Sequence, residues 1–365
     1  MKIQIVLLSI LAISSVFFVQ KQNLTENQKE DYIIYQKYLE WKEGYKQEKQ
    51  INNLRSSSDN YRFSIFKENY LFVEQYNQSQ NDVVLEINQF ADLSQQEFQS
   101  KFLNYLDQSE NYELIDREEL DILTSEYVEQ DTENNTILLT QTADYPPIQV
   151  DWTQKGKVTK IKNQGNCGSC WAFATAGAYE SAYAIQNGFL NNLSEQKILD
   201  CQLNYGCNGG FIEFGMRYSE QYGLGYESVY PYVSGQTGKS QQCTYPSDKI
   251  AFYGKQHYRI QPNSPAALQK YLIDRPLAIT VDASSSLFQF YNSGIIASGC
   301  GVEKTHAVLL TGYSDDVSDG KNRYWKIKNS WGTSWGENGY VRILKSQYTG
   351  VGVCGVMREA WYATV

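Results

Sequence analysis

Residues 164–188 read QGNCGSCWAFATAGAYESAYAIQNG and decide how the rest of the chain is interpreted. A loop of Gly, Asn and Ser carries two cysteines and passes into an Ala-rich run that ends at Asn187-Gly188, which is typical of a helix with a glycine stop. Cys170 is therefore predicted at the N-terminus of a helix, where unpaired N–H groups and the helix dipole favour an anion. A thiol placed there is biased toward the nucleophilic thiolate.

The spacing of Cys167 and Cys170 also fits half a zinc site or a thioredoxin-like dithiol. A zinc site needs a second Cys/His pair at similar spacing, which the sequence lacks. A dithiol site needs a strand–helix–strand pattern around it, and no clear one is present. We therefore expect no metal and no cofactor, and we interpret Cys170 as a nucleophile.

Three segments in order resemble the papain-like cysteine proteases. NQGNCGSCWAF looks like the active-site segment of that family. THAVLLTGYS, which contains His306, resembles its histidine segment, and YWKIKNSWGTSWGENGY, which contains Asn329, resembles its asparagine segment. His306 lies 136 residues and Asn329 159 residues after Cys170, against about 130–150 in the family. The second spacing is slightly long, but the motif is specific.

The resemblance implies a cysteine endopeptidase that hydrolyses peptide bonds in protein and peptide substrates. Cys170 would be the nucleophile, His306 its proton shuttle, and Asn329 the group that orients the imidazole. Gln164 and the backbone N–H of Cys170 would donate hydrogen bonds to the oxyanion. Trp331 would shield the Asn329–His306 hydrogen bond from water.

The resemblance also implies a substrate-binding region. Gly209 and Gly210 would form a wall along which an extended peptide lies. The pocket for the second residue before the cut would be lined by Phe211, Ile212, Thr280, Ala307 and Glu359. Because Glu359 would place a carboxylate at the pocket floor, we expect the pocket to accept Arg as well as hydrophobic side chains. The alternative is that Glu359 is exposed and points into water.

All seven cysteines follow residue 166. An odd number in a secreted-looking chain indicates three disulfides and one free thiol, but the spacing does not give the connectivity. By resemblance, the pairs would be Cys167–Cys207, Cys201–Cys243 and Cys300–Cys354, which leaves Cys170 free.

The N-terminal part predicts a secreted precursor. Residues 1–20 have the pattern of a signal peptide, although an N-terminal membrane anchor is an alternative. No other segment is long and apolar enough to cross a bilayer, so we expect no stable membrane association after signal removal. The destination would be the lysosome or vacuole, or the outside of the cell.

Residues 21–144 are interpreted as an inhibitory propeptide, with an acidic linker at 107–133 and cleavage between 140 and 147. Residues 61–77 place apolar side chains at three- and four-residue steps, which predicts an amphipathic helix. Two motifs resemble those of cathepsin L-like propeptides. The positions of the first are occupied by Arg62, Phe66, Asn69, Val73 and Asn77, and those of the second by Asn88, Phe90 and Asp92. Three residues differ from the family: Val73 replaces Ile, Ser58 replaces Glu, and Glu86 replaces Gly.

Charge is distributed unevenly along the chain. Residues 1–144 carry 12 basic and 25 acidic groups, whereas residues 145–365 carry 20 basic and 16 acidic groups. The opposite signs favour association of the propeptide with the enzyme and argue against a nucleic-acid partner. We expect acid pH to protonate propeptide carboxylates, including Asp92, and so to trigger self-processing.

The predicted fold class is α+β. A helix-rich half contains a helix capped by Ser194, and from about Lys249 the pattern changes to short strands at 277–281, 307–310, 324–328 and 339–344. The resemblance implies a papain-like two-lobed fold over residues 145–365, with a helical left lobe and an antiparallel β-barrel-like right lobe, in a monomer.

Two other functions remain open from the sequence: a non-catalytic papain-fold binding or storage protein, and protease inhibition by the isolated segment 25–106. His257, in an irregular stretch, is interpreted as structural. Because the chain has no spare pair of histidines, it lacks the paired-histidine loop of carboxydipeptidases of this family, which favours endopeptidase activity.

Overall fold

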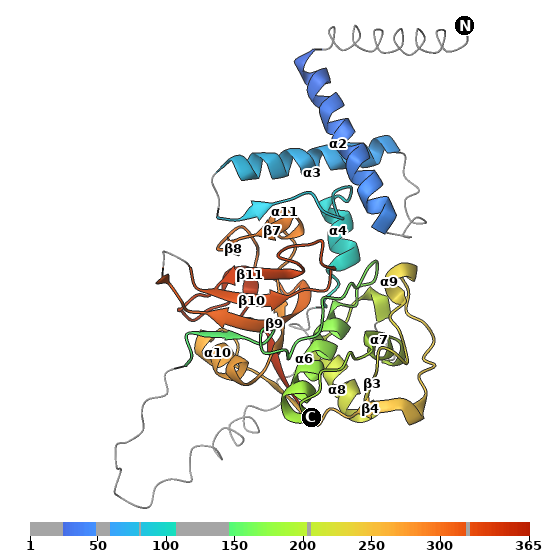
Figure 1. Cartoon of the computed structure of the whole chain (residues 1–365), viewed down its shortest axis with the longest axis vertical. Coiled ribbons are helices and arrows are strands. Elements are labelled where there is room, and N and C mark those ends of the chain that lie inside the picture. The colour runs from blue at the N-terminus through green and yellow to red at the C-terminus, as the bar shows by residue number, and fades with distance from the viewer. Residues whose placement is uncertain (1–24, 49–58, 80–81, 107–145, 203–205, 319–321) are drawn as a thin grey trace, which may run out of the picture. The chain divides into compact units, whose positions relative to one another are not determined.

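The computed structural model of the chain describes residues 25–48, 59–79, 82–106, 146–202, 206–318 and 322–365 (Figure 1). The predicted signal peptide and the acidic linker lie outside the described residues. Among the described residues, none of the helices combines the length and the apolar character that a membrane crossing requires.

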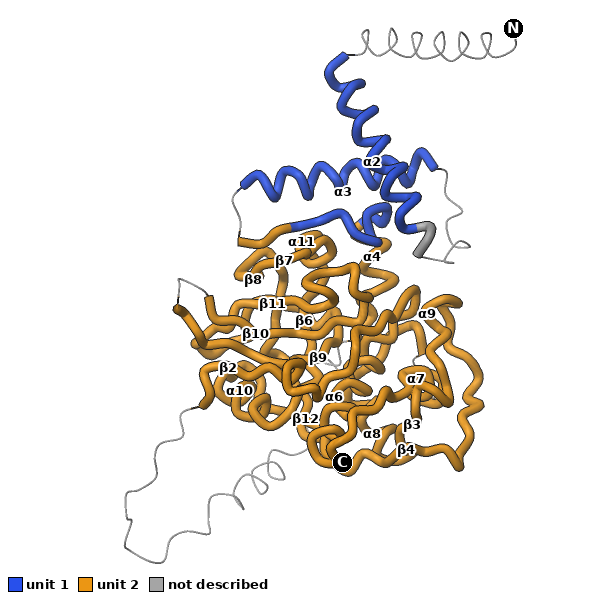
Figure 2. The backbone as a smooth tube through the Cα atoms, viewed as in Figure 1, with its two compact units in different colours: residues 1–81, 85–94 blue, residues 82–84, 95–365 orange. Residues whose placement is uncertain are grey.

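The chain divides into two compact units (Figure 2). The first comprises residues 1–81 and 85–94, and the second residues 82–84 and 95–365. Residues 95–106, which the sequence assigns to the propeptide, therefore pack as part of the second unit. The boundary between the two compact units thus falls near residue 95, whereas the expected cleavage site lies between residues 140 and 147. The two differ because residues 95–106 contact the enzyme although they belong to the propeptide in sequence.

Helices α2 (Glu26–Glu48) and α3 (Asp59–Gln78) form the first unit, and α3 confirms the helix predicted at 61–77. The two helices pack through aromatic side chains. The ring of Phe66 lies 5.2 Å from that of Tyr38 and 5.4 Å from that of Trp41, measured between centroids. Burial of these large rings supplies most of the apolar contact between the two helices.

The polar residues of α3 hold the chain that follows it. The Arg62 guanidinium donates a hydrogen bond to the carbonyl of Asp92 (2.8 Å). The Asn69 amide donates to the carbonyls of Ala91 (2.9 Å) and Leu93 (3.0 Å). The spaced Arg and Asn positions thus satisfy backbone carbonyls of residues 91–93, which lack partners in a helix or sheet.

The second unit is built on an eight-stranded sheet with the order β5-β12-β6-β9-β10-β11-β8, in which β2 also pairs with β9. Every pairing is antiparallel except the parallel pairing of β8 with β11. The sheet path has two ends, so no closed barrel forms among the described residues. The bounds are β2 (Gln149–Asp151), β5 (Gln256–Arg259), β6 (Leu277–Val281), β8 (Ile295–Ile296), β9 (His306–Ser314), β10 (Tyr324–Lys328), β11 (Tyr340–Leu344) and β12 (Ala360–Thr364).

Helix α6 (Cys170–Asn187) lies between this sheet and helices α7 (Glu195–Cys201) and α8 (Ile212–Tyr222) (Figure 1). Every residue from Cys170 to Ala182 is buried, as expected of a helix that is covered on all sides. Gly188 ends the helix in the left-handed conformation (φ 83°), which glycine adopts without steric cost. Ser194 caps α7 by accepting a hydrogen bond from the N–H of Lys197, as predicted.

The remaining elements are short or flank the sheet. His257 lies in β5 and not in an irregular stretch, because residues 256–259 pair with the final strand β12. Its Nδ1 lies 2.7 Å from Glu220 Oε1, which agrees with a structural role. The other bounds are β1 (Val84–Leu85), α4 (Gln95–Phe102), β3 (Leu224–Gly225), α9 (Ser234–Thr237), β4 (Ile250–Phe252), α10 (Pro265–Asp274), α11 (Ser286–Gln289) and β7 (Tyr291–Ser293).

Three disulfides stabilise the second unit, and Cys170 is the free cysteine. They are Cys167–Cys207, Cys201–Cys243 and Cys300–Cys354, the connectivity that the family resemblance implies. Because Cys167 is bonded to Cys207, the CxxC segment is neither half of a zinc site nor a redox dithiol.

We predict that Gly215→Ala destabilises α8 although alanine is the better helix former. A Cβ at Gly215 would lie 2.5 Å from Thr175 Oγ1 in α6, and overpacking of this kind costs about 1–3 kcal/mol. The matched control is Gly44→Ala in α2, where a Cβ meets nothing within 4 Å; there we expect a gain of about 0.5–1 kcal/mol. Hydrogen exchange of each helix, read by mass spectrometry, measures both effects, and greater protection of α8 in Gly215→Ala would contradict the prediction.

Candidate active site

Cys170 is the first residue of α6 and is completely buried. The backbone N–H groups of Ala307, Trp171 and Cys170 itself lie near its sulfur and act to lower the pKa of the thiol. Burial nevertheless raises the pKa of the thiol to about 11. In this covered state of the chain, desolvation thus opposes the thiolate that the helix N-terminus and the three N–H groups favour.

His306 is the first residue of strand β9. The next residue, Ala307, has its backbone N–H near the Cys170 sulfur, so the start of β9 lies next to Cys170. Its Nε2 lies 2.8 Å from Asn329 Oδ1. Its Nδ1 has no hydrogen-bond partner among the described residues. Burial lowers the pKa of the imidazole to about 4, although the hydrogen bond to Asn329 acts in the opposite direction. Burial thus disfavours the charged form of both reactive groups.

Trp331 covers the imidazole. The two rings are stacked, with centroids 4.6 Å apart and an interplanar angle of 29°. Trp331 is itself packed edge-on against Trp335 and Phe288, at 5.0 and 5.9 Å. This aromatic cluster keeps water from the His306–Asn329 pair, because none of its members leaves appreciable surface exposed.

Gln164 is also buried beside these residues. Its Oε1 accepts a hydrogen bond from the Ser330 hydroxyl (2.7 Å), and this bond fixes which way the amide points. Its Nε2 donates to the carbonyl of Cys167 (3.0 Å) and, more weakly, to that of Phe102 (3.4 Å). The side-chain amide is therefore directed toward the loop before Cys170 and toward the end of α4.

Residues 103–106, which follow α4, cover the site from the outside. Tyr105 N–H donates to the carbonyl of Thr305 and Leu106 N–H to that of Gly210, each at 3.3 Å. Tyr105 and Gly210 form a parallel bridge. A Cβ at Gly209 would lie only 2.1 Å from the Asn104 carbonyl oxygen. Gly209 and Gly210 thus let residues 104–106 approach their backbone more closely than a residue with a side chain would allow.

The region expected to bind the second residue before the cut is occupied by the Tyr105 side chain. Tyr105 packs edge-on against Phe211 at 6.0 Å, and its hydroxyl donates to Glu359 Oε1. Glu359 is 6% exposed, so the alternative of a carboxylate in water is wrong. Among the other expected lining residues, Ile212, Thr280 and Ala307 are fully buried.

Comparison with known proteins gives the family. A model of the papain family of cysteine proteases matches residues 146–364. This chain belongs to that family. A model of the cathepsin propeptide inhibitor domain matches residues 38–98. The chain is thus a papain-like cysteine endopeptidase made as a zymogen, as the sequence predicts.

Relatives in the family support this assignment over most of the chain. Papain from Carica papaya is 37% identical over 305 residues, covering 83% of this chain and 80% of papain. The proform of the ragweed pollen cysteine protease Amb a 11 superposes with a TM-score of 0.73 at 29% identity, covering 93% of this chain and 96% of that one. Digestive procathepsin L 3 of Tenebrio molitor gives 0.72 at 28% identity, covering 91% and 99%.

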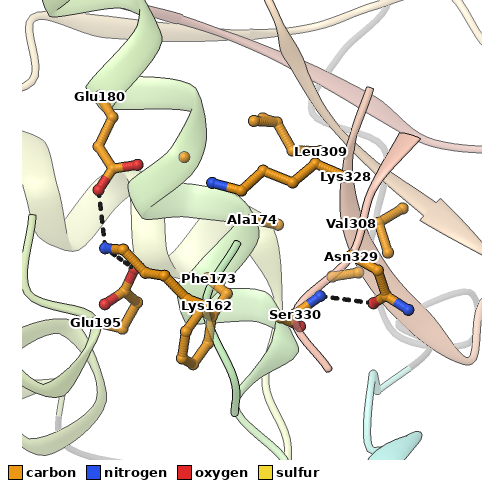
Figure 3. A pocket seen from close by; sticks show the side chains of 12 residues that line it. Lys162, Phe173, Ala174, Glu180, Glu195, Val308, Leu309, Lys328, Asn329 and Ser330 are labelled. Atoms are coloured by element: carbon orange, nitrogen blue, oxygen red, sulfur yellow. Dashed lines mark hydrogen bonds and ion pairs between the residues drawn. The ribbon is translucent and has the colours of Figure 1, made fainter. Parts of the chain in front are cut away.

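A cluster of buried charges lines a pocket that Asn329 also lines (Figure 3). Lys162 Nζ lies 3.0 Å from Glu180 Oε1 of α6 and 2.6 Å from Glu195 Oε1 of α7. Lys328, the residue before Asn329, donates to Thr159 Oγ1 at 2.8 Å. Burial lowers the pKa of Lys328 to about 8. The pKa of Lys162 is raised, because these two carboxylates and that of Glu227, at 3.5 Å, outweigh its burial.

No motif or pattern in the sequence marks two residues of this region, Tyr105 and Lys304. Tyr105 lies between the propeptide motifs and the acidic linker, and no motif marks it. Lys304 lies two residues before His306, and its Nζ is 3.1 Å from Glu359 Oε2. Its proximity to Glu359 depends on the pairing of strands far apart in the sequence.

We predict that Lys162→Met lowers the free energy of unfolding by about 3–5 kcal/mol at pH 8, since it leaves two buried carboxylates without their cation. Arg217→Met is the matched control, because Arg217 makes an i,i+4 ion pair with Glu213 while 49% exposed; its loss should cost under about 0.5 kcal/mol. Urea denaturation followed by circular dichroism measures both. Equal losses in the two variants would show that the buried cluster adds no stability beyond that of a surface pair.

Proposed function

We propose that Cys170, His306, Asn329 and Gln164 carry out the peptide hydrolysis of this zymogen after the covering segment has left. The observation that carries the proposal is the contact of an unbonded thiol with the N–H of Ala307, next to an imidazole whose other nitrogen is held by Asn329. An orienting group on one ring nitrogen and a nucleophile beside the histidine form the arrangement that triad catalysis needs.

In the proposed reaction, the Cys170 thiolate attacks the scissile carbonyl carbon while His306 holds the proton. Gln164 Nε2–H and the Cys170 N–H stabilise the resulting oxyanion. His306 then protonates the leaving amine as the C–N bond breaks, which leaves a thioester on Cys170. Water attacks the thioester with His306 as base, and the C–S bond breaks to release the acid and the thiol.

Residues 103–106 would inhibit the enzyme both by occupying its substrate wall and by burying its reactive groups. A buried site disfavours the charged thiolate–imidazolium pair, so the covered enzyme holds a neutral thiol and a neutral imidazole. The parallel bridge to Gly210 supports the view that this segment runs in the direction opposite to that of a substrate.

The remaining features of the proposed precursor come from the sequence. We assign residues 1–20 to a signal peptide, 21–144 to the propeptide, and 145–365 to the mature peptidase domain, with cleavage between 140 and 147. The enzyme would pass through the secretory pathway to a lysosome or vacuole, or out of the cell, and would act as a monomer on protein and peptide substrates without a cofactor or a nucleic-acid partner.

The proposal is tested by hydrolysis of reporter peptides by the purified precursor across pH 4–8 under reducing conditions. We expect activity that rises at acid pH and is absent in Cys170→Ala. No activity after proven removal of the propeptide would favour the rival function, a non-catalytic papain-fold binding or storage protein. Activity that survives in Cys170→Ala would exclude Cys170 as the nucleophile.

We predict that Gln164→Ala lowers kcat of the mature enzyme by about 10²–10³-fold, since loss of one oxyanion donor typically costs that much. KM should change little, because the interaction forms in the transition state. Gln196→Ala is a control for loss of a buried glutamine amide, since Gln196 bonds Asp200 and Ser234 in a separate network. A change of KM alone in Gln164→Ala would assign the residue to ground-state binding.

We predict that closure of residues 95–106 over the site is tightest between about pH 6.5 and 9. Covering lowers the pKa of His306 to about 4, so the open form binds more protons between pH 4 and its ordinary value near 6.5, and acid opens the site. Covering raises the pKa of Cys170 to about 11 from 9.0, so the closed form binds more protons above pH 9, and alkali also opens it.

Hydrogen exchange of residues 95–106, corrected for its intrinsic pH dependence, measures this closure. The measurement is made in a Cys170→Ala background, which prevents self-processing and removes the titration of the thiol. In that background His306→Gln should make the exchange of residues 95–106 nearly independent of pH between pH 4 and 6.5. If the exchange still rises toward acid pH in His306→Gln, acid opening would be assigned to propeptide carboxylates such as Asp92, as the charge asymmetry of the chain predicts.

A further inference from the structure

The pocket around Glu359 contains a buried ion pair and a phenol. Lys304 Nζ lies 3.1 Å from Glu359 Oε2, with only 11% and 7% of the two side chains exposed. The other carboxylate oxygen, Oε1, accepts hydrogen bonds from Trp361 Nε1 (2.8 Å) and from the Tyr105 hydroxyl. The carboxylate is therefore already matched by one cation before any substrate enters.

The phenol of Tyr105 makes a hydrogen bond at the bottom of the pocket. Its hydroxyl donates to Glu359 Oε1 and lies near the backbone N–H of Ile212. Ile212 is the first residue of α8, so its N–H has no partner within the helix. The ring packs edge-on against Phe211. The pocket thus offers one acceptor, one donor and an aromatic wall, which together match a tyrosine side chain.

We propose that this pocket selects tyrosine at the second residue before the scissile bond, and that Lys304 is the specificity-determining residue because it holds Glu359 as an acceptor for a neutral phenol. This inference rests on the proposed function, in which substrates replace residues 103–106. Tyr105 belongs to a segment that pairs with Gly210 in the parallel direction, opposite to that proposed for a substrate. Because the pocket contacts only the side chain, it would recognise the tyrosine of a substrate in the same way.

Phenylalanine would fill the same space but would offer no hydroxyl donor to Glu359 Oε1, so this buried carboxylate oxygen would keep only the hydrogen bond from Trp361 Nε1. A hydrogen bond to a charged group is worth enough to change binding about ten- to a hundredfold. A site built to bond a hydroxyl discriminates against the analogue that lacks it for this reason.

Arginine, which the sequence analysis expects the pocket to accept, would bring a second cation next to Lys304. Glu359 can neutralise only one of the two, and juxtaposed like charges in a desolvated pocket are strongly unfavourable. We therefore expect tyrosine to be preferred over arginine, and we expect removal of Lys304 to reverse part of this preference.

The test uses the processed enzyme, with its active concentration set by titration of Cys170 with iodoacetamide, and reporter peptides that differ only in having Tyr, Phe or Arg at this position. We expect kcat/KM for the Tyr peptide to exceed that for the Phe peptide about ten- to a hundredfold. Lys304→Met should raise the Arg:Tyr ratio about tenfold or more, and Glu359→Gln should reduce the Tyr:Phe ratio. Lys239→Met, a change at an exposed lysine, should leave both ratios unaltered.

Equal rates for the Tyr and Phe peptides, or a preference of the unaltered enzyme for Arg, would overturn the proposal. If the enzyme cleaves none of the reporters, the proposed function would be overturned instead. The pocket would then be tested by a second experiment on the full-length chain. There, at neutral pH, Tyr105→Phe should speed alkylation of the buried Cys170 about tenfold or more, whereas Tyr348→Phe, at an 82% exposed tyrosine, should not. Unchanged alkylation in Tyr105→Phe would overturn the pocket assignment.

Discussion

Helix α6 packs directly on strand β9, and the relative position of Cys170 and His306 follows from that contact. Gly177 faces Leu309, where even a Cβ would lie 3.1 Å from Leu309 Cδ2. The absence of a side chain there lets the helix approach the strand closely. Cys170 begins the helix and His306 begins the strand, so this approach brings an unpaired thiol and an imidazole to the same end of both elements.

Burial determines the chemistry of these two groups as strongly as their position does. In the covered chain desolvation disfavours both the thiolate and the imidazolium, because it raises the pKa of Cys170 and lowers that of His306. The helix N-terminus and the Asn329 hydrogen bond favour the charged forms and so act in the opposite direction. The proposed inhibition by residues 103–106 would therefore be an electrostatic effect as well as a steric one.

The three buried glutamates among the described residues of the second unit have lysine partners. Glu180 and Glu195 share Lys162, and Glu359 is paired with Lys304. An unpaired buried charge would be costly, so these pairs are required once the acidic residues lie in the interior. The first set lines a pocket that Asn329 also lines, between the helices and β10 (Figure 3). The second leaves one carboxylate oxygen available to a hydroxyl donor, which links structural charge balance to substrate choice.

The local sequence determined the elements and the chemical types. The helix from Cys170, its glycine stop at Gly188 and the capping Ser194 could be predicted because each depends on residues within one turn. The strands could be predicted from runs of β-branched and aromatic residues. The family resemblance added the disulfide pairing, since connectivity depends on the whole fold.

Tertiary structure decided what burial and distant contacts control. No local pattern indicates that desolvation opposes the helix dipole at Cys170, because the burial of the thiol depends on contacts between parts of the chain that are far apart in the sequence. The pairing of Lys304 with Glu359, and the place of Tyr105 against both, likewise join residues that are far apart in the chain. The sequence identifies a carboxylate in the pocket, but its partners, and hence the side chain it would accept, depend on how β6, β9 and β12 are brought together.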